Sequence, residues 1–91
     1  MARNILMPGG LPLGQPGSSP DIREVSGGLK EAQDMFDDLT KGATPVIGST
    51  HPNLVRLPGG GTVGLRVFSK AGPPTVDVNI PGIPIREIKF I

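Results

Sequence analysis

Two alternating runs of residues, separated by a short glycine- and proline-rich break, constrain the fold of this chain most strongly. Residues 62–68 and 75–80 each alternate apolar with polar or small side chains, and residues 71–74 interrupt the pattern with the sequence AGPP. Because successive side chains of a strand point to opposite faces, each run predicts a strand with one apolar and one polar face. If the two strands pair as antiparallel neighbours, their apolar faces build one core. The polar face then carries Arg66, Thr75, Asp77 and Asn79, with Ser69 and Lys70 at its rim.

One segment, residues 26–41, is typical of a helix. Its apolar residues recur at helical spacing and form a single stripe, which consists of Leu29, Ala32, Met35, Phe36 and Leu39. Ser26 or Gly28 can cap the first turn, and Gly42 stands where a C-terminal glycine is expected. We expect the stripe to pack on the apolar face of the sheet.

Four further runs are candidates for the rest of the sheet. Residues 21–25 indicate a short strand or a capping turn, and residues 44–49 an edge strand, because Pro45 disfavours a central position. Residues 54–57 and 85–91 indicate strands. Consecutive strands joined by tight turns pair antiparallel. The prediction is an α+β fold in which an N-terminal helix packs on a small antiparallel sheet of four to five strands, whose other face stays open.

The first 20 residues differ in composition from the rest of this 91-residue chain. Eight of them are glycine or proline, and they show no periodicity. This composition is typical of irregular structure, so residues 1–20 are predicted to be a flexible leader or linker and residues 21–91 the folded domain. The apolar run at residues 5–7 could instead pack on the domain as an edge segment.

Composition excludes several kinds of site. The chain has no cysteine and one histidine, so thiolate metal sites, disulfides and histidine-rich metal sites are absent, and no cofactor is expected. No apolar run approaches the roughly 18 residues of a membrane span, and no signal peptide is recognisable. Residues 1–50 carry four basic and six acidic side chains, whereas residues 51–91 carry five basic and two acidic ones. The strand-rich half therefore favours an anionic partner, although ordinary charge scatter on a solvated surface is the alternative.

The remaining polar residues suit phosphodiester chemistry on RNA without a metal. Arg66 is the leading candidate for holding a phosphate, because the guanidinium fork matches phosphate oxygens. Ser69 and Thr75 could donate hydrogen bonds to it, and His51 is the obvious acid or base because it titrates near neutrality. Candidate substrate-binding residues are Arg56, Lys70 and Asp77. The alternatives are an ion pair between Arg66 and Asp77, ordinary strand propensity for Thr75, and a surface position for His51 in a turn.

Residues 57–90, LPGGGTVGLRVFSKAGPPTVDVNIPGIPIREIKF, resemble the C-terminal end of bacterial polymorphic toxins. These include contact-dependent inhibition effectors, Rhs-type proteins and filamentous-haemagglutinin-like exoproteins. The matching segments are residues 61–66, 69–70, 72–77 and 85–90, and the helical stretch at residues 28–42 fits what precedes that ending.

The resemblance implies a fold similar to the barnase–EndoU–colicin–RelE superfamily. It further implies a metal-independent ribonuclease, often acting on transfer RNA and neutralised by a cognate immunity protein. Such a module is carried at the end of a larger secreted or cell-surface protein and acts in the cytoplasm of the target cell. By position, Arg66, Ser69 and Thr75 fall where these toxins place active-site residues. His51 lies outside the matching tail, so no role carries over to it.

Three functional hypotheses follow. The first is an endoribonuclease toxin that leaves 2′,3′-cyclic phosphate and 5′-OH ends. The second is a non-enzymatic, β-rich interaction module of a larger protein, and the third a nuclease inhibitor or RNA-binding protein without catalysis. The first two differ at Arg66, because an enzyme needs this side chain free on an open face whereas an interaction module would have it paired. The immunity protein of a toxin with this charge distribution is expected to be acidic.

Overall fold

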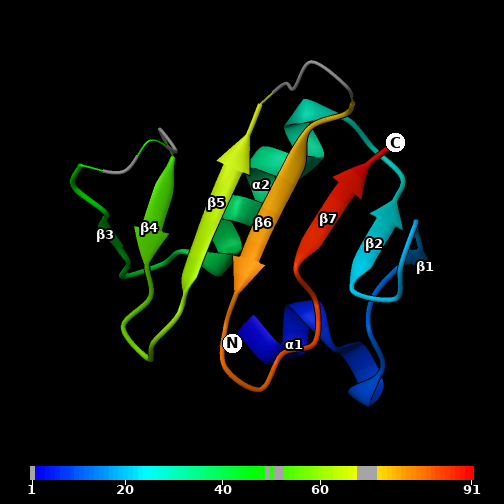
Figure 1. Cartoon of the computed structure of the whole chain (residues 1–91), viewed down its shortest axis with the longest axis horizontal. Coiled ribbons are helices and arrows are strands. Elements are labelled where there is room, and N and C mark those ends of the chain that lie inside the picture. Colours follow the sequence, from blue (N-terminus) through cyan, green and yellow to red (C-terminus); the bar gives the residue numbers. More distant parts are fainter. Residues whose placement is uncertain (1, 49, 51–52, 68–71) are drawn as a thin grey trace.

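The computed structural model describes residues 2–48, 50, 53–67 and 72–91. They form a single mixed sheet with helices on one side (Figure 1). In chain order the elements are α1 (Ala2–Leu6), the 3₁₀ turn η1 (Pro8–Gly10), β1 (Gln15–Pro16), β2 (Ile22–Val25), α2 (Leu29–Leu39), β3 (Thr44–Pro45), β4 (Leu54–Arg56), β5 (Thr62–Arg66), β6 (Thr75–Asn79) and β7 (Glu87–Phe90). The strand order across the sheet is β1-β2-β7-β6-β5-β4-β3.

The α+β class and the packing of one main helix on one sheet are confirmed, but the sheet is larger than expected. It has seven strands among the described residues, not four to five, and it is mixed because β2 runs parallel to β7. Two strands, β1 and β2, precede α2, so the order of one helix followed by strands was wrong. The parallel pair β2–β7 joins segments more than 60 residues apart, so no local turn in the sequence indicates this pairing.

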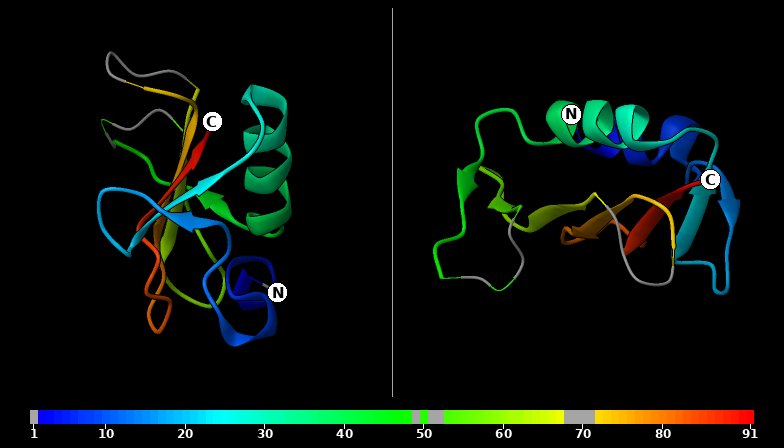
Figure 2. Two further views of the ribbon diagram at one scale, coloured as in Figure 1. Left: turned by 90° about the vertical axis from the view of Figure 1, so that its right-hand side faces the viewer. Right: turned by 90° about the horizontal axis from the view of Figure 1, so that it is seen from above.

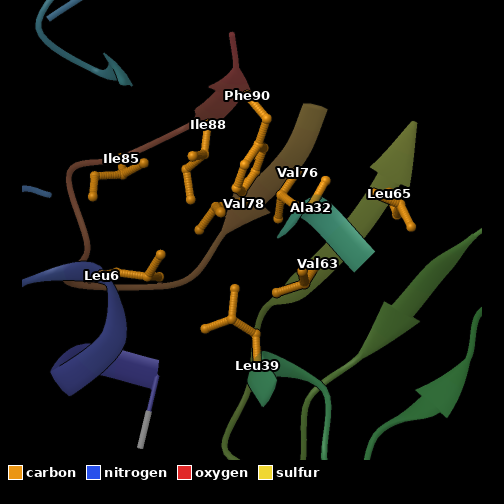
Figure 3. Close-up of a cluster of buried hydrophobic side chains, with 10 residues drawn as sticks. All are labelled: Leu6, Ala32, Leu39, Val63, Leu65, Val76, Val78, Ile85, Ile88 and Phe90. Atoms are coloured by element: carbon orange, nitrogen blue, oxygen red, sulfur yellow. The ribbon is translucent and has the colours of Figure 1, made fainter. Parts of the chain in front are cut away.

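The central strands pair as the alternation predicts. Val63 lies opposite Val78, and Leu65 opposite Val76, in the antiparallel pair β5–β6. Val76 in turn lies opposite Ile88 of β7. These side chains point to the helix side, where the buried core consists of Leu6, Ala32, Leu39, Val63, Leu65, Val76, Val78, Ile85, Ile88 and Phe90 (Figure 3). The apolar faces of the strands therefore form one continuous core layer.

Helix α2 covers this layer, and among the described residues no helix lies on the opposite face of the sheet (Figure 2). It begins after Gly28, whose N–H donates to Oε1 of Glu31 at 2.7 Å. The stripe is only partly buried: Ala32 and Leu39 are in the core, Met35 and Phe36 pack against it, and Leu29 is 48% exposed. The helix is thus shorter than the predicted residues 26–41, and its first apolar residue contributes little to the core.

Phe36→Ala should cost about 1.5–2.5 kcal/mol of unfolding free energy. A fully buried phenylalanine would lose about 3–5 kcal/mol on truncation, but Phe36 is half-buried at the edge of the core. Urea denaturation of both proteins measures the difference. Ile88→Ala, at a fully buried position, should cost at least as much, about 2–5 kcal/mol. A larger loss for Phe36→Ala than for Ile88→Ala would contradict this account of the core.

Residues 2–20, predicted as a flexible leader, are instead packed into the fold. Leu6 of α1 is fully buried beside Ile85 and the β6–β7 connection (Figure 3). Strand β1 pairs with β2, and the N–H of Leu13 donates to the carbonyl of Leu6 at 3.0 Å. The glycines and prolines therefore shape turns of an ordered segment, which is close to the edge-segment alternative for residues 5–7. Helix α1 is too short for its sequence to show a period.

Candidate functional site

The uncovered face of the sheet presents polar side chains in cross-strand rows. One row, here the Arg66 row, runs from Arg66 of β5 through Thr75 of β6 to Lys89 of β7. A second, the Gly64 row, runs from β4 to β7 through Leu54, Gly64, Asp77 and Glu87. Strand pairing therefore brings Arg66, Thr75 and Asp77 onto one face, as the alternation predicts.

Arg66 bridges the two carboxylates of the Gly64 row. Its Nε and Nη2 donate to the two carboxylate oxygens of Asp77, each at 2.9 Å, and Nη2 also donates to Oε1 of Glu87 at 3.2 Å. The hydrogen bonds with Asp77 raise the pKa of Arg66, against a smaller opposing effect of burial. Asp77 and Glu87 lie directly opposite each other in β6 and β7, where like charges repel. The guanidinium compensates this repulsion, so Arg66 is paired and not free.

The pairing leaves one edge of the guanidinium available. Arginine has five N–H donors, and the bonds to Asp77 and Glu87 occupy the Nε and Nη2 atoms. Within the described part of the chain, Nη1 makes no hydrogen bond, and the Arg66 side chain is 38% exposed. Arg66 can therefore hold its carboxylates and still donate to an external oxygen through Nη1.

Thr75 is in register with Arg66 but is poorly placed to donate to a ligand. The residue is 2% exposed, and its Oγ1 donates to the carbonyl of Pro73 at 3.0 Å. The hydroxyl thus stabilises the backbone that enters β6. The role of a direct hydrogen-bond donor to phosphate, expected for Thr75, would require this bond to break.

The other expected site residues are scattered or lie outside the described part. His51, Ser69 and Lys70 fall outside the described residues. Arg56 is exposed on β4, opposite Thr62 of β5, and so lies on the same face as Arg66. It is separated from Asp77 because β5 lies between β4 and β6. Of the expected cluster, the structure brings together Arg66, Thr75 and Asp77.

Sequence reasoning passed over Glu87, Lys89 and Arg86. Lys89 is half-buried opposite Thr75, and among the described residues it has no ion-pair partner. Glu87 binds Arg66, and Arg86 lies next to it at the start of β7. The alternation of Glu87 and Lys89 with Ile88 and Phe90 was visible in the sequence, but the register of β7 against β6 was not.

A shallow pocket of about 250 Å³ opens on this face beside the Gly64 row. Its lining residues come from β4, β5, β6 and the start of β7, and are Leu54, Thr62, Asp77, Val78, Asn79, Arg86 and Glu87. Gly64, which lies between Leu54 and Asp77, contributes no side chain to the row. The pocket therefore combines apolar side chains with neutral polar, acidic and basic ones.

The described residues hold no group of three or more His, Asp or Glu side chains placed to bind a metal ion. Neither of their helices has the length and apolar character that crossing a bilayer requires.

Comparisons with protein-family models, with curated proteins and with solved structures found no match to this chain.

Proposed function

We propose that this chain is the ribonuclease domain of a polymorphic toxin and that the open face of its sheet is the RNA-binding surface. The proposal takes the substrate to be transfer RNA and the reaction to be metal-independent cleavage to 2′,3′-cyclic phosphate and 5′-OH ends. The observation that carries it is the Arg66 row, because two cations, Arg66 and Lys89, flank Thr75 on a face that no helix of the described residues covers. The resemblance of residues 57–90 to toxin C-termini supports the same conclusion.

In the proposed reaction, the 2′-hydroxyl oxygen attacks the adjacent phosphorus and loses its proton to a base. The bond from phosphorus to the 5′-oxygen then breaks, and the departing oxygen gains a proton. Negative charge builds on the non-bridging oxygens in between, so donors aimed at these oxygens lower the barrier. Arg66 supplies Nη1–H donors and Lys89 an ammonium group from the same row.

The ion pairs of Arg66 have a positioning role in this scheme. Asp77 and Glu87 fix the guanidinium plane through Nε and Nη2, so that its Nη1 edge needs no reorganisation when phosphate arrives. Proton transfer is assigned to His51, because histidine is the side-chain type whose ordinary pKa lies near neutrality. Arg56 is proposed to contact the RNA backbone, as are Ser69 and Lys70, which lie outside the described residues.

The domain should cleave RNA in EDTA. Purified protein is incubated with total bacterial RNA, with and without chelator, and the new ends are mapped by their resistance to phosphatase and their reactivity with polynucleotide kinase. His51→Ala should lower the rate by about 10²–10³-fold, the usual share of a general acid or base being about 10²–10⁴. A requirement for Mg²⁺, or no cleavage by a folded protein under any condition, would overturn the proposed function.

The proposed partner is a cognate immunity protein that covers the open face. Residues 51–91 carry five basic and two acidic side chains, so a partner that is acidic at its contact surface complements them. Co-expression with the partner should rescue cells that the free domain stops from growing. A partner bound only to α2, or one with a basic contact surface, would contradict this part of the proposal. The larger protein that carries the domain delivers it to the cytoplasm of the target cell.

The second candidate function, a non-enzymatic interaction module, is favoured by one observation. Arg66 is ion-paired, which is the arrangement expected of a module without catalysis. The two functions differ in what the free Nη1 edge does, because only the enzyme uses it on RNA. A folded domain that neither cleaves RNA nor stops growth, yet binds a protein partner through β5 and β6, would establish the second function instead.

A further inference from the structure

The sheet ends on both sides in a short, exposed strand. Among the described residues, β1 pairs only with β2 and β3 pairs only with β4, and each of these two edge strands has two residues. They lie at opposite sides of the molecule (Figure 1). The outer side of an edge strand presents backbone N–H and C=O groups to which a strand of another molecule can bind. Strands β1 and β3 are therefore the places where a second molecule could extend the sheet.

A proline occupies the outward position of β3. The N–H of Val46 donates to the carbonyl of Leu54 in β4 at 3.0 Å. In an antiparallel pair, residues that exchange hydrogen bonds alternate with residues that do not, so the preceding pair, Pro45 and Val55, is not hydrogen-bonded. The backbone nitrogen of Pro45 thus points away from β4. Proline carries no N–H, so the outer side of β3 lacks a donor at this position.

Pro16 has the same place in β1, at the other edge. The N–H of Gly17 donates to the carbonyl of Ile22 at 2.7 Å, so the nitrogen of Pro16 points away from β2. Each edge strand therefore pairs inward through the residue that follows its proline. Neither offers a donor outward at the proline itself.

The extended run at the β3 edge is short and has the proline at its middle. Gly42 and Gly48, with φ values of 78° and 82°, adopt a left-handed conformation that an extended strand does not contain. An added strand could therefore pair only with residues 43–47, across Pro45. Ile47 follows β3 with a side chain that is 96% exposed. The edge thus combines an exposed apolar side chain, which favours association, with a backbone that cannot complete the pairing.

We propose that Pro16 and Pro45 close the two sheet edges to strand addition and so keep the chain from pairing with a second copy of itself. Pro45→Val supplies the missing N–H and a β-branched side chain that suits a strand. Two copies can then pair antiparallel about residue 45, where the N–H of each copy donates to the carbonyl of the other. The inference goes beyond the proposed function, because it concerns backbone groups at the edges and needs no RNA.

Sedimentation equilibrium of Pro45→Val and Pro16→Val tests the proposal. Each variant should self-associate at least about 10-fold more strongly than the wild type, because a symmetric dimer gains two backbone hydrogen bonds. The new amide of each variant should exchange with deuterium more slowly as the protein concentration rises, which locates the contact at the edge. The double variant can pair at both edges, so it should form assemblies longer than a dimer.

Thr44→Val is the matched control for the β3 edge. Thr44 is exposed on the same strand, but its N–H points toward β4, so this variant gains a β-branched apolar side chain without an outward donor. It should associate no more strongly than the wild type. Association of Thr44→Val as strong as that of Pro45→Val would assign the effect to the apolar side chain and overturn the proposal.

Other outcomes also contradict the closed edges. One is self-association of folded Pro45→Val and Pro16→Val at the wild-type level, and another is a wild-type dimer that pairs through β1 or β3. Circular dichroism and urea denaturation show whether each variant is folded. If one of the two does not fold, the variant at the other edge decides. If neither folds, the prolines are needed for the fold itself, and their proposed role in preventing self-association is rejected.

Discussion

Arg66→Ala should lower the rate of RNA cleavage by about 10²–10³-fold while the domain stays folded. The magnitude is that of removing one donor aimed at developing negative charge in a transition state. The effect is expected in the cleavage rate at saturating RNA, since the proposed contacts of Arg56 and Lys89 with the backbone are kept. The measurement is single-turnover cleavage of a labelled transfer RNA, with folding checked by circular dichroism.

The loss of Arg66 should have a small effect on stability. It leaves Asp77 and Glu87 directly opposite each other, but both side chains are partly exposed, at 27% and 33%, so solvent screens their repulsion. We expect a cost of about 1 kcal/mol or less. Asp77→Asn then separates the proposed binding of phosphate by Arg66 from the positioning of its guanidinium. It keeps the guanidinium and removes the carboxylate that fixes its plane.

Controls for this prediction come from elsewhere on the chain. Lys30→Ala removes the exposed Lys30–Asp34 ion pair of α2 and should leave cleavage unchanged. Thr75→Val keeps the shape of a buried side chain but removes the hydroxyl that donates to Pro73, so it should lower cleavage less than Arg66→Ala does. If folded Arg66→Ala cleaves RNA at the wild-type rate, Arg66 is not the phosphate-binding residue, and the proposed catalytic role of the Arg66 row is wrong.

The parts of the fold that could be predicted from sequence are those set by local alternation. Strands β5 and β6 each contain consecutive alternating positions and are close in sequence, so their pairing and the shared face of Arg66 and Asp77 follow from period and proximity. The ion pair between these two residues was one of the alternatives that the sequence left open. What decided it was the actual register, in which Asp77 lies one pair away from Arg66 along the strands.

The parts that could not be predicted depend on pairings between distant segments. Glu87 enters the site only because β7 pairs with β6, and β7 also pairs in parallel with β2 from the beginning of the chain. Strand β1 has two residues, one of them Pro16, which is too little sequence for a period of 2 to show. The burial of Leu6 is likewise a tertiary effect, because the other buried residues of the core that it enters lie at Ala32 and beyond.

The ordered start of the chain has a specific physical cause in Arg23. This residue of β2 is 9% exposed, and its guanidinium donates to three backbone carbonyls: from Nε to Leu13 at 2.8 Å, from Nη1 to Pro20 at 3.0 Å and from Nη2 to Gly14 at 3.1 Å. A buried cation without enough partners is costly, so these three bonds stabilise both the charge and the path of the segment. Arg23 thereby fastens residues 13–20 to the sheet.

Arg23→Met should cost about 2–4 kcal/mol of unfolding free energy and loosen the first 20 residues. Methionine can fill much of the volume, but it leaves three carbonyls without their charged donor. Hydrogen bonds to charged groups contribute about 1.5–3 kcal/mol each, and water that bonds to the carbonyls offsets part of the loss. Arg23→Lys should lose nearly as much, because one ammonium group cannot reach three carbonyls in the directions of a guanidinium fork. Urea denaturation gives the free energy, and limited proteolysis shows whether cleavage within residues 8–20 accelerates.

Arg3→Met on the exposed side of α1 is the matched control, since Arg3 makes no side-chain hydrogen bond or ion pair within the described residues. This substitution should change the free energy of unfolding by less than about 0.5 kcal/mol. If Arg23→Met loses less than about 1 kcal/mol and its first 20 residues resist protease as the wild type does, Arg23 does not fasten the segment. If instead the loss matches that of Leu6→Ala, about 2–5 kcal/mol, the segment and the core unfold together. In that case a protein that begins at residue 21 cannot fold alone, because the core position of Leu6 would be empty.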